Sequence, residues 1–217
     1  MADIQPQLND RSRSSYLFSF FWRLLITLII LFGLIIFIFY LILLPRPFKF
    51  YVTNTQLTQF DYTNNTLHYN MVLNFTAHNP NKRLSIYYDK VQAQAFYEGS
   101  RFANVDLITK YVNSFRQRKK MSDPINGVFS GQQLLMLNND QVLEFNKEKS
   151  DGVYSIHMKL YFRIRFRHGI SISHIYKPKV KCDIKVPLSS SNSKNIETFT
   201  FTQVLTNKCK VVLGPTY

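Results

Sequence analysis

The chain has 217 residues, of which 46% are apolar and 15% are aromatic. This length and composition suffice for one domain with a packed core and a tail, and they exclude an intrinsically disordered chain. Lys and Arg outnumber Asp and Glu by 27 to 13, giving a net charge of +14. Residues 45–217 hold 24 of the basic and 11 of the acidic residues, so nearly all of this charge follows the apolar segment described next. Such a charge attracts polyanions in general and does not select one of them.

An uncharged stretch of 21 residues, Leu24 to Leu44, contains 18 Leu, Ile and Phe residues. As a helix it reaches about 31 Å, the thickness of the hydrocarbon core of a bilayer. The alternatives are a buried core helix, which would show polar interruptions, and a cleaved signal peptide, which would have a shorter apolar stretch. The sequence therefore predicts an N-terminal tail (1–23), a transmembrane helix (24–44), a membrane-proximal segment (45–65) and a globular domain (66–217).

Three features favour a cytosolic N-terminus and an extracellular domain. Three arginines precede the helix and two basic residues closely follow it, a weak bias toward a cytosolic tail. Asn64-Asn65-Thr66 and Asn74-Phe75-Thr76 are acceptor tripeptides that predict glycans on Asn64 and Asn74. Cys182 and Cys209, the two cysteines, both follow the helix and are expected to form a disulfide. The alternative is a pair of buried free thiols in a cytosolic domain.

Two segments alternate apolar and polar side chains with the period of two that marks a half-buried strand. They run from Leu67 to Ala77, where Asn74 falls on the polar face, and from Tyr154 to Phe166, where many of the polar positions are basic. Six shorter strands are expected over residues 49–55, 90–97, 102–107, 125–130, 179–186 and 198–210.

One helix is predicted from about Asn138 to Lys149, with Val142, Leu143 and Phe145 facing inward. Six to eight strands with one short helix favour an all-β fold, an antiparallel β-sandwich of the immunoglobulin or fibronectin kind, placed after the transmembrane helix. A β-barrel is the alternative.

The sequence holds no recognisable catalytic, metal or cofactor motif. It lacks a Gly-rich phosphate loop, a Gly-x-Ser-x-Gly elbow and a His-Glu-x-x-His pair, and its cysteines lack the spacing of zinc ligands. His68 and His78 share a strand face but lie more than about 30 Å apart, too far to share a metal. Glu144 and Glu148 are expected on the surface of the predicted helix. We therefore expect a non-enzymatic protein without a cofactor.

Two basic clusters are candidates for contact with a polyanion. The first, in a predicted loop, consists of Arg116, Arg118, Lys119 and Lys120, and the second lines the polar face of the strand at 154–166. The alternative is a solvated surface that keeps the domain soluble. Outside the cell the polyanion would be an acidic polysaccharide such as pectin, and inside it would be anionic lipid. A membrane anchor argues against nucleic acid.

Residues 79–89, Asn-Pro-Asn-Lys-Arg-Leu-Ser-Ile-Tyr-Tyr-Asp, resemble the Asn-Pro-Asn…Tyr-Tyr-Asp signature of plant harpin-induced-like proteins. These are relatives of the non-race-specific disease resistance protein and carry a group 2 late embryogenesis abundant domain. The motif positions are Asn79, Pro80, Asn81, Arg83, Tyr87, Tyr88 and Asp89. Segments 145–149, 160–166, 180–187 and 207–210 resemble the family in the same order, so the resemblance covers nearly the whole chain. The basic run at 116–120 departs from the family, whose loop is less basic.

The resemblance implies a β-sandwich on the outer face of the plasma membrane with a short cytosolic tail. It also implies a role in defence or stress responses, through contacts with immune-signalling proteins or acidic cell-wall polysaccharide. Lipid binding by some relatives gives the alternative of a lipid-binding or membrane-tethering module with an apolar groove for an acyl chain. The Asn-Pro-Asn segment also has a purely structural interpretation, as a turn in which Pro80 fixes φ.

Overall fold

The computed structural model describes residues 10–43, 46–189 and 207–212. By internal contacts the chain divides into two units, Met1–Leu44 and Pro45–Tyr217, and each is described by itself. The first contains α1 (Asp10–Leu43), which begins 14 residues before the predicted start because residues 10–23 hold no proline or glycine that would end a helix. Its stretch Phe18–Leu41 is long and apolar enough to cross a membrane, and none of it is buried.

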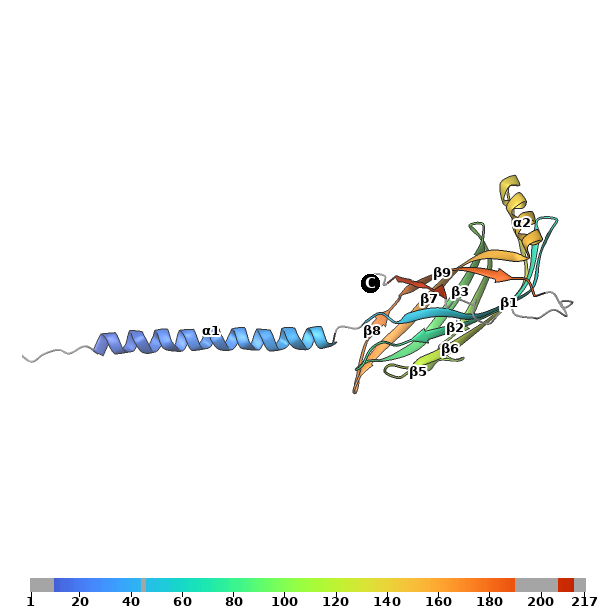
Figure 1. Ribbon diagram of the computed structural model, residues 1–217. Coiled ribbons are helices and arrows are strands. Elements are labelled where there is room, and N and C mark those ends of the chain that lie inside the picture. Colours follow the sequence, from blue (N-terminus) through green and yellow to red (C-terminus); the bar gives the residue numbers. More distant parts are fainter. Residues whose placement is uncertain (1–9, 44–45, 190–206, 213–217) are drawn as a thin grey trace, which may run out of the picture. The chain divides into compact units, whose positions relative to one another are not determined.

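The second unit is built from two antiparallel sheets that pack face to face (Figure 1). The order in the first sheet is β10-β1-β2-β6, formed by Asn207–Lys208, Lys49–Thr63, Thr66–His78 and Ser122–Leu134. The order in the second is β11-β9-β7-β3-β4, formed by Lys210–Val212, Lys179–Pro187, Val153–His168, Ser85–Tyr97 and Ser100–Ile108. Two short strands extend it, β5 (Phe115–Gln117) on β3 and β8 (Ser171–Tyr176) on β7. The predicted β-sandwich after an apolar helix is confirmed, and the barrel alternative is wrong.

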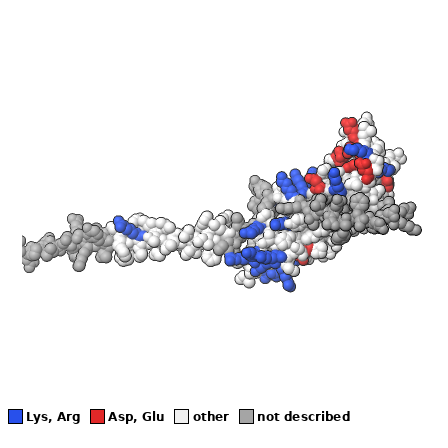
Figure 2. Space-filling model, in the orientation of Figure 1, with Lys and Arg blue, Asp and Glu red and all other residues white. Residues whose placement is uncertain are grey.

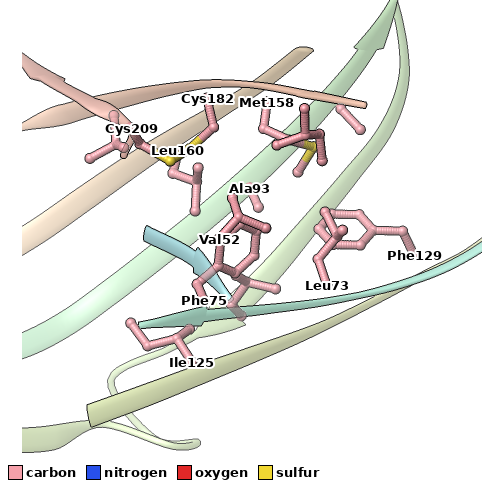
Figure 3. Close-up of a cluster of buried hydrophobic side chains, with 14 of the residues drawn as sticks. Val52, Leu73, Phe75, Ala93, Ile125, Phe129, Met158, Leu160, Cys182 and Cys209 are labelled. Atoms are coloured by element: carbon pink, nitrogen blue, oxygen red, sulfur yellow. A yellow bond between two sulfur atoms is a disulfide. The ribbon is translucent and has the colours of Figure 1, made fainter. Parts of the chain in front are cut away.

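The core lies between the sheets and follows the alternation of the long strands. Leu73 and Phe75 of β2 point toward Met158 and Leu160 of β7 (Figure 3). Aromatic rings supply much of the filling, and fully burying one such side chain contributes about 1.5–3 kcal/mol. Rings from opposite sheets touch, since the centroids of Phe50 and Phe162 lie 5.3 Å apart.

Strand β1 places most of the expected membrane-proximal segment inside the sandwich. It pairs with β2 along its whole length and contributes Phe50, Val52, Leu57 and Phe60 to the core. Two register shifts, between Val52 and Asn54 and between Leu57 and Gln59, reverse which residues face inward. The structure therefore differs from the expected boundary at residue 66, because these irregularities interrupt the period-two pattern.

The predicted helix is α2 (Asn139–Asp151). Asn138 caps it in a capping box with Gln141, and Gly152 ends it at a positive φ of 67°. Phe145 faces the core as expected, but Leu143 is 67% exposed, so its predicted inward orientation is wrong. Of the predicted strand at 198–210, only residues 207–210 lie within the described ranges.

Candidate functional site

The Asn-Pro-Asn segment ties together three parts of the domain. The side-chain oxygen of Asn81 accepts a hydrogen bond from the backbone N–H of Arg46 (2.8 Å), and its amide donates to the Arg46 carbonyl (2.9 Å). Its amide also donates to Asn79 Oδ1 (2.9 Å), and the Asn79 amide donates to the carbonyls of Leu84 (2.9 Å) and Arg118 (3.1 Å). Both asparagines are buried. This network supports the structural interpretation of the motif, at the place where the chain enters the domain.

Tyr87 and Tyr88 point to opposite faces of β3. Tyr88 is fully buried, its hydroxyl donates to Gln117 Oε1 (3.0 Å), and the Gln117 amide donates to the carbonyl of Ala77 (2.7 Å). This chain of hydrogen bonds links the two sheets, because Ala77 belongs to β2. Burial raises the pKa of Tyr88. Gln117 is thus a core residue within the basic run, which the sequence pattern did not indicate.

On the outer face, Tyr87 lies among three arginines. Arg167 donates to the Tyr87 hydroxyl (2.8 Å), and the guanidinium carbons of Arg116 and Arg165 each lie 5.8 Å from the ring centroid. The hydrogen bond from Arg167 is the main cause of a lowered Tyr87 pKa. Arg165 donates twice to Asp89, at 2.7 and 2.8 Å, and these bonds raise the Arg165 pKa. The motif residues Tyr87 and Asp89 therefore organise a cationic part of the sheet.

The first basic cluster is divided between a strand and a turn. Arg116 belongs to β5, in register with Tyr87, so its predicted place in a loop is wrong. Arg118, Lys119 and Lys120 form an exposed turn whose Lys120 N–H donates to the carbonyl of Asn81 (3.2 Å). Figure 2 shows Lys and Arg gathered on the part of the domain near β5 and β8, and Asp and Glu gathered around α2. Contact of the cluster with a polyanion stays a prediction.

Cys182 of β9 and Cys209 form the expected disulfide, with sulfur atoms 2.03 Å apart. The alternative of two free thiols is therefore wrong. Cys209 lies between β10, which pairs with β1, and β11, which pairs with β9. Its N–H donates to the carbonyl of Phe50 (3.0 Å). The bond therefore fastens the segment that passes from one sheet to the other. Closing a loop of this length stabilises the fold by about 3–4 kcal/mol.

The two acceptor tripeptides occupy different surroundings. Asn64 and Asn65 have φ values of 51° and 59° and form the two-residue turn between β1 and β2, the geometry of a type I′ hairpin. Asn64 is exposed at this tip. Asn74 lies within β2, half-buried on the outer face, between Asn54 of β1 and Asn126 of β6. Glycans at both positions stay predictions.

Glu148 is a buried carboxylate that the sequence pattern did not indicate. Glu148 is only 7% exposed, although it was expected on the helix surface. The Tyr97 hydroxyl donates to its Oε2 (2.8 Å) and the Ser155 N–H to its Oε1 (3.0 Å). Burial, and then this hydrogen bond, raise the pKa of Tyr97. The available signal was the spacing of three residues from Phe145, which places both on one helix face.

The described residues offer no cluster of metal ligands. Within the ranges that the structure describes, no three His, Cys, Asp or Glu residues come together to hold a metal ion. His157 pairs with Asp183 at 2.6 Å on an exposed face. A shallow hollow of about 420 Å³ beside the Asn64 turn is mostly polar, lined by Thr63, Asn64, Thr66, His68, Gln132, Gln133 and Leu134.

No model of a known protein family matches the sequence. The chain is similar to several proteins of Arabidopsis thaliana. It is 40% identical over 196 residues to NDR1/HIN1-like protein 10, covering 89% of this chain and 82% of that one. It is 39% identical over 177 residues to NDR1/HIN1-like protein 3 (81% and 74% covered), and 38% identical over 158 residues to NDR1/HIN1-like protein 2 (72% and 64% covered). A crystal structure of a protein from Archaeoglobus fulgidus shares 9% identity and a TM-score of 0.31, covering 64% of this chain and 98% of that one, a likeness too weak to support an inference.

Proposed function

The chain belongs to the NDR1/HIN1-like family, and from this membership we propose that it is a single-pass plasma-membrane protein that acts in plant defence and stress responses. Residues 1–23 form its cytosolic tail, and its sandwich faces the outside of the cell. There the domain acts without catalysis, through contacts with immune-signalling proteins or acidic cell-wall polysaccharide.

The observation that carries this proposal is the disulfide in the domain that follows the apolar helix. Cys182 and Cys209 bond the segment that connects the two sheets, so the bond is part of the folded domain. Disulfides form and persist in oxidising compartments such as the secretory pathway and the cell exterior. The exposed apolar side chains of residues 18–41 are those that a lipid-spanning helix presents to a bilayer.

The packing of the sandwich bears on the lipid-binding alternative. An acyl chain inside the domain would need a gap between the sheets, but Phe50 of β1 and Phe162 of β7 are in ring contact there. Phe60 of β1 and Tyr154 of β7 make a second such contact, with ring centroids 4.7 Å apart. An internal acyl-chain groove therefore has no support among the residues described.

Protease protection tests the proposed orientation. The full chain, tagged at both ends and produced in microsomes, should lose its N-terminal tag to added protease while the C-terminal tag survives until detergent is added. Digestion of the C-terminal tag in sealed microsomes would overturn the extracellular placement. For the defence role, plants without the gene should support more pathogen growth, and the wild-type chain should restore resistance.

A further inference from the structure

One end of the sandwich, which we term the basic end, is the end where β1 begins. Pairing of Lys49 with His78, of His78 with Ser122 and of Ser85 with Arg167 brings the loops before β3 and β6 and the end of β7 to this end. Its exposed cations include Arg46, Lys49, Lys82, Arg83, Arg118, Lys119 and Lys120. The acidic residues closest to them in the chain are Asp89, which is paired with Arg165, and Asp123, which is half-buried.

The hairpin between β7 and β8 adds exposed aliphatic side chains to the basic end. Ile170, at its tip, is 97% exposed, and Ile172 is 48% exposed. The turn is held in place because Arg167 donates to the carbonyl of Gly169 (2.8 Å). An isolated exposed aliphatic residue is common in proteins. Here the aliphatic tip lies among cations, and this combination is typical of surfaces that lie in the headgroup layer of a membrane.

We propose that the basic end docks onto the anionic surface of the membrane that carries the protein, with Ile170 inserted among the lipid headgroups. Arg46 is the third residue after the end of α1, so the covalent chain between them spans at most about 11 Å. A membrane crossed by α1 is therefore within reach of this end. An acidic polysaccharide complements the cations but offers no apolar layer for Ile170, whereas anionic lipid offers both. The proposal rests on α1 as the anchor and on anionic lipid in the leaflet that faces the domain.

Fluorescence from the full chain in nanodiscs tests the docking directly. An environment-sensitive dye on Ile170→Cys labels the single free thiol, because Cys182 and Cys209 are bonded to each other. The matched control is Leu143→Cys, on the exposed surface of α2. In discs of phosphatidylcholine with phosphatidylinositol, the dye at 170 should shift to the blue, and nitroxide lipids should quench it several-fold more than the dye at 143. Equal quenching of the dyes at 170 and 143 would overturn the proposal. So would quenching at 170 that is as strong in discs of phosphatidylcholine alone as in discs that also contain phosphatidylinositol.

Charge removal tests the cations. Each Lys or Arg near an anionic surface is worth about a fivefold change in binding, so a variant with Arg118→Ser, Lys119→Ser and Lys120→Ser should lower the ratio of docked to undocked protein about a hundredfold. A control that removes three charges elsewhere, Arg101→Ser with Lys147→Ser and Lys149→Ser, should leave this ratio unchanged. In about 1 M salt, where the screening length is about 3 Å, the wild type should also lose the quenching.

Two further measurements distinguish other ligands of the same charge. Clustering of protein-bearing vesicles with protein-free anionic vesicles, without quenching at residue 170 in nanodiscs, would overturn docking on the protein's own membrane in favour of a second membrane. Retention on immobilised polygalacturonate, without quenching by lipid, would overturn it in favour of a wall polysaccharide. Neither result changes the protease-protection pattern, so failure of this proposal is separable from failure of the proposed function.

Discussion

The hydroxyl of Tyr97 on β3 donates a 2.8 Å hydrogen bond to the buried carboxylate of Glu148 on α2. The same carboxylate accepts the backbone N–H of Ser155, so one side chain joins the helix to two strands. Replacing Glu148 by Ala leaves the buried Tyr97 hydroxyl and the part-buried Ser155 N–H without this partner, and it should lower the free energy of unfolding by about 2–4 kcal/mol. Urea unfolding of the full chain in detergent, followed by circular dichroism, measures this loss.

Glu144 provides the control on the same helix. Its carboxylate pairs with Lys147 at 3.2 Å, and the two side chains are 45% and 67% exposed, so solvent screens the pair. Replacing Glu144 by Ala should therefore change the free energy of unfolding by less than about 0.5 kcal/mol. Similar losses for the two variants would mean that the buried hydrogen bonds of Glu148 contribute little.

The tyrosines predict a loss of stability at high pH. Burial raises the pKa of Tyr69, Tyr88, Tyr97 and Tyr154, whereas the arginines around Tyr87 lower its pKa. Tyrosines in the unfolded chain ionise near pH 10, so the stabilisation from these four phenols, whose pKa values are raised in the folded chain, is complete below about pH 10 and is lost as the pH rises above it. Absorbance of tyrosinate should show one early ionisation that disappears in Tyr87→Phe. Ionisation of the buried tyrosines before circular dichroism reports unfolding would contradict this.

Asn81 predicts a local effect on the entry of the chain into the domain. Replacing Asn81 by Ala removes the partners of both backbone groups of Arg46 and one partner of Asn79. The expected loss is about 2–3 kcal/mol, because two part-buried hydrogen bonds to Arg46 and one buried hydrogen bond to Asn79 are lost. Hydrogen exchange should become faster first at residues 46–50. Arg83→Ala, at an exposed position of the same loop, should leave the exchange at residues 46–50 unchanged. If Arg83→Ala accelerated that exchange as much as Asn81→Ala does, the hydrogen bonds of Asn81 would not be its cause.

Strand β2 was predictable because its pattern is uninterrupted, with Leu67 through Ala77 facing inward at every second position. Strand β1 was predictable only in its first half, since two bulges reverse the inward parity before Leu57 and again before Phe60. Strand β8 carries exposed or half-buried residues on both faces, so it has no alternation to detect. The period-two pattern reports burial on one face, and it fails where neither face is buried or the register shifts.

The candidate site was predictable in position but not in role. The Asn-Pro-Asn motif marks the loop before β3, yet its partner Arg46 lies 35 residues earlier in the sequence and is brought to it only by the pairing of β1 with β2. The buried states of Gln117 and Glu148 likewise depend on partners from distant segments, Tyr88 and Tyr97. Local sequence shows which residues can form hydrogen bonds, whereas tertiary contacts decide which of them are buried.

The two acceptor tripeptides predict unequal glycan occupancy. Asn64 lies at an open turn, whereas Asn74 lies on the half-buried outer face of β2 between two neighbouring strands. Thr66→Ala and Thr76→Ala remove the tripeptides without replacing either asparagine, which matters at Asn64 because its positive φ favours asparagine over most residues. Thr66→Ala should abolish most of the glycan-dependent mass of the full chain from secretory-competent plant cells, and Thr76→Ala should change it little. Mass spectrometry of the two glycopeptides gives the occupancy of each asparagine. Higher occupancy at Asn74 than at Asn64 would contradict this prediction and would show that the glycan is attached to Asn74 before β2 pairs with β1 and β6.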